Sequence, residues 1–144
     1  MIYVDYNATA PVMREAREAW LNVTENIGGN PSSMHQAGTR AAIALSDARE
    51  KLAGFLGCHP QDIIWTSGAT EANNMVTHHF SKTLGAHDEI WISAIEHPCV
   101  HDSAKHYFGK RAKLIPVTHD GMVDLDWITT EMADKRPGLV GVMA

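Results

Sequence analysis

Short apolar segments alternate along this chain with longer segments of helical periodicity, and this alternation constrains the fold more than any other feature. The apolar segments are rich in β-branched side chains and lie at residues 63–66, 89–93, 113–117 and 139–143. Because strands buried on both faces read as short, continuous apolar runs, we expect four strands. Strand–helix–strand repetition predicts an α/β fold with a parallel sheet and right-handed crossovers.

Helix start and stop signals place three helices between these strands, at residues 70–84, 97–108 and 124–134. Pro98 suits the first helical position, Asp124 is a candidate N-cap, and Gly85 and Gly109 follow helix ends. Two further helices are expected nearer the N-terminus. The first is indicated by Met13, Ala16, Trp20 and Val23, which would fall on one apolar face. The second carries an apolar stripe between residues 41 and 55 and closes at Gly57.

Composition excludes several classes of protein. With 44% hydrophobic and 20% charged residues, the chain can form a packed core. The net charge of -5 argues against nucleic acid as a partner. No apolar run approaches the roughly 18 residues of a membrane span, so no membrane association is expected. Two cysteines make no disulfide framework, and with no signal peptide visible we expect a cytoplasmic protein.

The last apolar run, residues 139–143, stands at the very end of the sequence. A parallel sheet normally continues, or its edge is covered by another element. We therefore expect this chain to be part of a larger protein.

A sharp local motif spans residues 65–74, Trp-Thr-Ser-Gly-Ala-Thr-Glu-Ala-Asn-Asn. It predicts a strand that runs through small residues directly into a helix. The first N–H groups of a helix are unpaired and carry partial positive charge, so a phosphate can be seated there, with the Thr70 hydroxyl as a further donor. The alternative is an ordinary capping box with Ser67 or Thr70 as the cap.

Two other polar segments are candidates for binding. His97 follows the strand expected at 89–93, and ligands of open α/β sheets gather at the carboxyl ends of strands. His97 would then lie beside the phosphate seat, to stack on a ring or transfer protons; the alternative is a solvent-facing histidine. The loops at residues 5–11 and 30–35 suit either binding or surface turns.

The other histidines and the cysteines give weaker signals. Cys99, His101 and His106 lack a second pair at ligand spacing, and no HExxH motif is present, so no metal site is expected. We interpret Cys58 and Cys99 as small buried thiols rather than nucleophiles.

Taken together and in this order, five motifs resemble the cysteine desulfurases of the NifS/IscS type. These are class V, fold-type I enzymes that depend on pyridoxal 5'-phosphate. The resemblance covers the whole chain and rests on residues 3–12, 29–35, 66–74, 96–98 and 120–125.

The resemblance implies a three-layer α/β/α fold with a mostly parallel sheet, part of the large domain of such an enzyme. Residues 1–35 would form an arm, a helix and a loop that pack with a smaller domain, and residues 36–144 would begin the large domain. Ala69 and Thr70 would hold the cofactor phosphate, and His97 would stack on the pyridine ring and move protons in catalysis. Residues at the substrate end of the pocket would be Asn7, Asn30 and His35.

The reaction implied takes sulfur from L-cysteine and leaves alanine and a protein-bound persulfide. The resemblance further implies a homodimer, a sulfur-acceptor or scaffold protein as partner, and a place in iron–sulfur cluster biogenesis. Two alternatives stay open. One is a related class V aminotransferase or lyase, and the other is a non-catalytic N-terminal fragment that binds anions weakly at residues 67–71.

The sequence departs from the family in its covalent chemistry. The family joins the cofactor to a lysine in a Ser-x-His-Lys segment, and this sequence contains no such segment. Neither Cys58 nor Cys99 matches the mobile cysteine that accepts sulfur. We therefore expect the chain to be the amino-terminal part of such an enzyme, and these 144 residues alone to be inactive.

Overall fold

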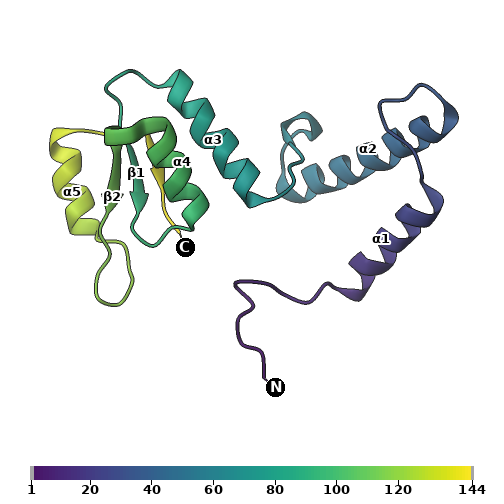
Figure 1. Ribbon diagram of the computed structural model, residues 1–144, viewed down its shortest axis with the longest axis horizontal. Helices are drawn as coiled ribbons and strands as arrows, with labels where there is room; N and C mark the ends of the chain where they lie inside the picture. Colours follow the sequence, from purple (N-terminus) through teal and green to yellow (C-terminus); the bar gives the residue numbers. More distant parts are fainter. Residues whose placement is uncertain (1, 144) are drawn as a thin grey trace. The chain divides into compact units, whose positions relative to one another are not determined.

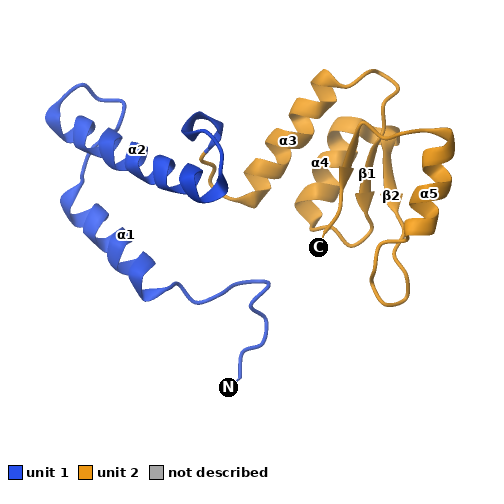
Figure 2. Ribbon diagram, turned by 180° about the vertical axis from the view of Figure 1, so that it is seen from behind, with its two compact units in different colours: residues 1–64 blue, residues 65–144 orange. Residues whose placement is uncertain are grey.

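The computed structural model describes residues 2–143 and divides into two compact units, with the boundary along the chain between Ile64 and Trp65 (Figure 2). The first unit holds α1 (Arg14–Asn26), α2 (Gln36–Leu56) and the 3-10 turn η1 (Pro60–Asp62). The second holds α3 (Ala69–Thr83), β1 (Ile90–Ser93), α4 (Pro98–Phe108), η2 (Gly109–Arg111), β2 (Ala112–Ile115), α5 (Leu125–Asp134) and β3 (Leu139–Gly141) (Figure 1). No helix within residues 2–143 is long and apolar enough to cross a lipid bilayer.

The two N-terminal helices form as predicted. α2 begins after His35, whose ring Nδ1 accepts the Gly38 N–H at 3.2 Å. It ends at Gly57, which has a φ of 70° in the left-handed region that glycine adopts without strain. Gly38 itself is required, since a Cβ there would collide with the Ser33 carbonyl oxygen. The sequence analysis divided the chain after residue 35, on the expectation that residues 1–35 pack with a smaller domain. That division stays a prediction.

The sheet of the second unit has three parallel strands in the order β2-β1-β3. In the central strand β1 every residue is buried. In its neighbours Leu114 is 54% exposed and Val140 48%. The expectation of strands buried on both faces therefore holds for β1 alone, which is the central strand of the sheet within residues 2–143.

Helices cover both faces of this sheet. Ile90 and Ile92 point to one face and pack with Ala104 and Phe108 of α4. Because side chains alternate along a strand, Trp91 points to the other face. There its ring meets Trp127 of α5 edge-on, with 5.3 Å between ring centroids. The predicted three-layer α/β arrangement with a parallel sheet is confirmed.

Two local predictions were wrong. Residues 63–66 form no strand. The sheet within residues 2–143 consists of β2, β1 and β3, and residues 63–66 pair with none of them. Ile64 in this segment is 68% exposed, so apolar character alone does not make a strand without a neighbouring edge. Cys58, expected to be a buried thiol, is free and exposed.

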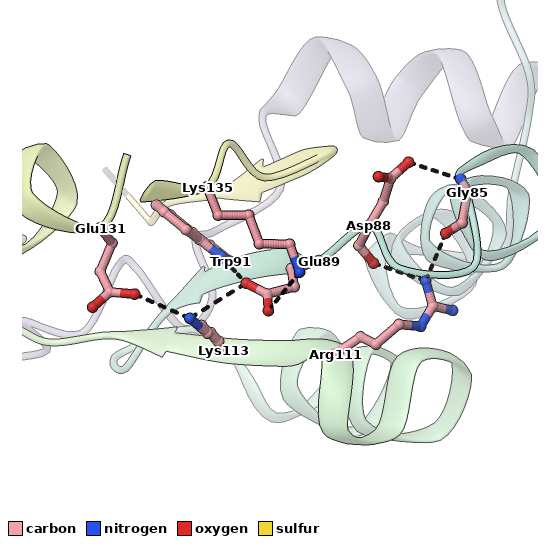
Figure 3. A network of polar contacts seen from close by, with 8 residues as sticks. All are labelled: Gly85, Asp88, Glu89, Trp91, Arg111, Lys113, Glu131 and Lys135. Carbon is pink, nitrogen blue, oxygen red and sulfur yellow. Dashed lines mark hydrogen bonds and ion pairs between the residues drawn. The ribbon is translucent and has the colours of Figure 1, made fainter. Parts of the chain in front are cut away.

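A charge network joins the start of β1 to β2 and to the C-terminal end of α5 (Figure 3). The Glu89 carboxylate accepts the Trp91 indole N–H at 3.0 Å, and it pairs with Lys135 at 3.0 Å and with Lys113 at 3.4 Å. Lys113 also pairs with Glu131 of α5 at 3.0 Å. Residues around β1, β2, α5 and the approach to β3 thus share one cluster of charges.

The Glu89 cluster predicts a specific dependence of stability on pH. The Trp91 N–H, followed by Lys135 and Lys113, holds the pKa of Glu89 below its ordinary value of 4.5. A lowered folded-state pKa stabilises the protein above the unfolded-state value, and that stabilisation is lost as the pH falls through the folded-state pKa. In Glu89→Gln we expect a smaller free energy of unfolding at pH 7 and a flatter decline below about pH 4.5.

Urea denaturation of the wild type and Glu89→Gln at several pH values between about 3 and 7 measures this effect. Glu25→Gln, at an exposed position of α1, is the control and should follow the wild type. Parallel stability curves for the wild type and Glu89→Gln would contradict the role given to Glu89.

Candidate functional site

A cavity of about 440 Å³ opens where the start of α3 approaches the start of α4. It lies entirely in the second unit, and its wall on the α4 side follows the loop that leaves the carboxyl end of β1. The residues that line it are Ser67, Gly68, Ala69, Thr70, Glu71, Asn73, His97 and Cys99.

Residues of the first turn of α3, Ala69 to Glu71, line this cavity. Gly68 is the N-cap and offers no side chain, while its carbonyl accepts the Ala72 N–H at 3.2 Å. The N–H groups of Ala69 and Thr70 precede the first intrahelical bond and have no acceptor within the helix. The alternative of a capping box with Ser67 or Thr70 as the cap is wrong, because Gly68 is the cap and no side chain forms a capping hydrogen bond there.

Glu71 fixes the loop ahead of this turn. Its carboxylate accepts the Ser67 N–H at 2.6 Å and the Ser67 hydroxyl at 2.8 Å. These bonds, the backbone one first, lower the pKa of Glu71 from its ordinary value. The carboxylate is thus ionised at neutral pH and directed to Ser67, one residue ahead of the N-cap.

His97 also lines the cavity. It is the N-cap of α4, with Pro98 at the first helical position as predicted, and its Nδ1 accepts the Cys99 N–H at 3.2 Å. The loop before it is held by Ser93, whose hydroxyl donates to Glu96 at 2.9 Å. The structure therefore brings Ala69, Thr70 and His97 to one cavity, while the ligand they would bind stays a prediction.

The three residues expected at the substrate end of the pocket, Asn7, Asn30 and His35, all lie in the first unit. Asn7 is exposed in a turn. The Asn30 side-chain oxygen accepts the Ser32 N–H at 2.9 Å, and His35 caps α2. A role for these residues near a substrate stays a prediction.

Sequence reasoning missed Asn73 and Cys99 as cavity residues. Asn73 lies four residues after Ala69, which places it on the same helix face one turn later. Cys99 follows His97 by two residues at the start of α4. Helix periodicity could have found Asn73, but only packing of α3 on α4 brings it to Cys99. Within residues 2–143 no group of three or more histidine, cysteine or acidic side chains is arranged to hold a metal ion.

The family is decided by a comparison with protein-family models. The model of the class-V aminotransferases matches residues 2–144. The chain belongs to the aminotransferase class-V family. This confirms the resemblance drawn from its motifs.

Individual relatives agree with this assignment. The chain is 35% identical to the cysteine desulfurase IscS of Rickettsia felis over 147 residues, which cover 99% of the chain and 36% of that relative. It is 37% identical to the selenocysteine lyase of Homo sapiens, across 94% of the chain and 35% of the relative. A solved structure of a NifS-like protein matches with a TM-score of 0.83 and 33% identity, over 97% of this chain and 39% of the other. The chain thus spans little more than a third of the curated relatives it matches.

Proposed function

We propose that this chain supplies the phosphate seat and the ring-facing histidine of a pyridoxal-phosphate-dependent cysteine desulfurase. The observation that supports the proposal is the shared cavity, which is lined both by the first turn of α3 and by His97. The similarity to proteins named cysteine desulfurase supports L-cysteine as the substrate.

The residues present fit a phosphorylated cofactor. A phosphate group needs several donors and a positive potential, and the start of α3 offers two backbone N–H groups, the Thr70 hydroxyl and the helix dipole. The small side chain of Ala69 and the absence of one at Gly68 leave the backbone open to close approach. The nearest carboxylate, Glu71, is already engaged by Ser67.

When bound, pyridoxal phosphate supplies an electron sink for carbanion chemistry at the amino-acid Cα. In the proposed site, Ala69 and Thr70 anchor the phosphate and thereby orient the rest of the group. His97 covers the ring and holds or moves a proton at its Nε2 atom. The 144 residues contain no Ser-x-His-Lys segment, so they bind and orient but provide no lysine that matches the family's pattern.

The wider setting is part of the same proposal. We place the activity in a cytoplasmic homodimer that passes sulfur to an acceptor or scaffold protein for iron–sulfur cluster biogenesis. The free state of Cys58 and Cys99 is what a reducing compartment favours. The net charge of -5 supports a small-molecule substrate over a nucleic acid.

A second candidate is a class V lyase, favoured by the similarity to a selenocysteine lyase. The two functions share the phosphate seat and differ in which amino acid they cleave. Rates of sulfide release from L-cysteine and selenide release from L-selenocysteine, measured on a protein that carries the lysine, distinguish them.

The phosphate seat is tested by amide chemical shifts in a titration with pyridoxal 5'-phosphate, which detects weak binding residue by residue. We expect the Ala69 and Thr70 amides and the His97 ring to shift. Inorganic phosphate should move only the amides, and pyridoxal without its phosphate should move neither. Thr70→Val removes one hydroxyl donor and should weaken binding roughly three- to tenfold.

The matched control is Thr129→Val, an exposed threonine of α5 whose hydroxyl donates to the Leu125 carbonyl at 2.8 Å. It should bind as the wild type does. Equal responses to pyridoxal with and without phosphate, or shifts that avoid residues 67–71, would refute the seat.

A further inference from the structure

Hydrogen bonds inside the cavity join Asn73 of α3 to two residues at the start of α4. Asn73 Nδ2 lies 3.3 Å from Cys99 Sγ, and Sγ lies 3.1 Å from His97 Nδ1. The backbone N–H of Cys99 reaches the same Nδ1 at 3.2 Å. All three residues line the cavity, and the helices that carry them pack against each other through the Thr77 and Ser103 hydroxyls, 3.2 Å apart.

The chemistry of the groups sets the direction of these bonds. A backbone N–H can only donate, so His97 Nδ1 must accept and carries no hydrogen. An amide nitrogen also only donates, so Cys99 Sγ accepts from Asn73. The thiol hydrogen of Cys99 is then donated to His97 Nδ1. Asn73 thus donates to Cys99, and Cys99 donates to His97.

We propose that Asn73 and Cys99 are positioning residues that hold His97 in the Nε2–H tautomer, with Nδ1 bound to the protein and Nε2 left for the occupant of the cavity. Which ring nitrogen of a neutral histidine carries the proton is set by the hydrogen bond that the other makes. No group within residues 2–143 is hydrogen-bonded to Nε2 in the structure.

This arrangement determines what His97 offers to a ligand. A neutral ring with its proton on Nε2 presents a hydrogen-bond donor to the cavity and no acceptor. The significance for catalysis rests on the proposed function, whereas the tautomer is a property of the protein alone. The two can therefore be tested separately.

The tautomer is read from the ring nitrogen shifts of ¹⁵N-histidine-labelled protein at about pH 8.5, where an ordinary imidazole is neutral. His97→Gln identifies the signals. We expect His97 Nδ1 at the shift of an unprotonated nitrogen, and Cys99→Ser should preserve this because a hydroxyl can also accept and donate. Cys99→Asp puts a carboxylate acceptor beside Nδ1 and should shift the tautomer ratio toward Nδ1–H by roughly tenfold or more.

His35 is an internal control in the same spectra. Its Nδ1 also accepts a backbone N–H, from Gly38, and it lies in the other unit. It should keep the Nε2–H form in every variant. A protonated His97 Nδ1 in the wild type, or an unchanged His97 ratio in Cys99→Asp, would overturn the proposal.

The contribution of Asn73 is tested by alkylation of Cys99 with iodoacetamide, using the exposed Cys58 as reference thiol. Asn73→Ala frees Sγ to leave the ring, and we expect the Cys99 rate to rise roughly three- to tenfold relative to Cys58. Asn74→Ala, whose amide donates instead to the Thr70 carbonyl, should leave this ratio unchanged. An unchanged ratio in Asn73→Ala would remove Asn73 from the proposal.

These results separate the two proposals. An Nε2–H tautomer that responds to Cys99→Asp, together with a phosphate seat that fails its titration, would uphold the positioning role and refute the cofactor. Phosphate-dependent binding with a protonated Nδ1 would do the reverse.

Discussion

Replacing Trp91 by alanine is expected to lower the free energy of unfolding of the second unit by about 3–5 kcal/mol. Trp91 is fully buried in the central strand, packs edge-on against Trp127 and donates its indole N–H to Glu89. The substitution removes the ring that joins α5 to the sheet and leaves the Glu89 carboxylate without one of its donors. Because domains are stable by only about 5–15 kcal/mol, a loss of this size removes a large fraction of the stability.

Trp91→Phe is the matched variant, since it keeps an aromatic ring but removes the N–H donor. We expect it to cost clearly less than Trp91→Ala. Urea unfolding followed by far-UV circular dichroism measures both. A loss below about 1 kcal/mol for Trp91→Ala would show that α5 is not held through this ring.

A polypeptide of these 144 residues is expected to release no sulfide from L-cysteine beyond the rate given by free pyridoxal 5'-phosphate. Its six lysines include none in a Ser-x-His-Lys context, and neither cysteine matches the sulfur acceptor of the family. Holding reactants in the correct geometry contributes on the order of 7–11 kcal/mol to such reactions. A phosphate seat and one histidine supply only part of that orientation.

Sulfide and alanine are measured over time with the polypeptide, with free cofactor alone, and with the Thr70→Ala and His97→Ala variants. Release above the free-cofactor rate that either variant abolishes would overturn the expectation. It would also point to one of the six lysines as the residue that carries the cofactor.

The site could be predicted from sequence as far as it is built from single helix starts. The small residues 67–70 and the His97–Pro98 pair mark two helix N-termini after apolar segments, and both helices begin within a residue or two of the expected positions. Asn73 and Cys99 were not predicted as cavity residues, because their contact joins residues 26 positions apart in the chain. Local patterns do not report which helix packs on which.

The sequence by itself determined the helices, the caps at Gly57 and Asp124, and the α/β class. Gly57 and Asp124 act as expected, since a cap depends on a residue and its own first or last turn. The sequence also predicted the three strands that form, at residues 90–93, 112–115 and 139–141. Tertiary structure decided which apolar run stays outside the sheet and which face of the sheet each strand residue takes. Residues 63–66 are as apolar as β1 yet form no strand, because a strand exists only where another backbone pairs with it. Likewise Trp91 and Ile92 are adjacent apolar residues of one strand. Only the placement of the helices decides that Trp91 packs against α5 and Ile92 against α4.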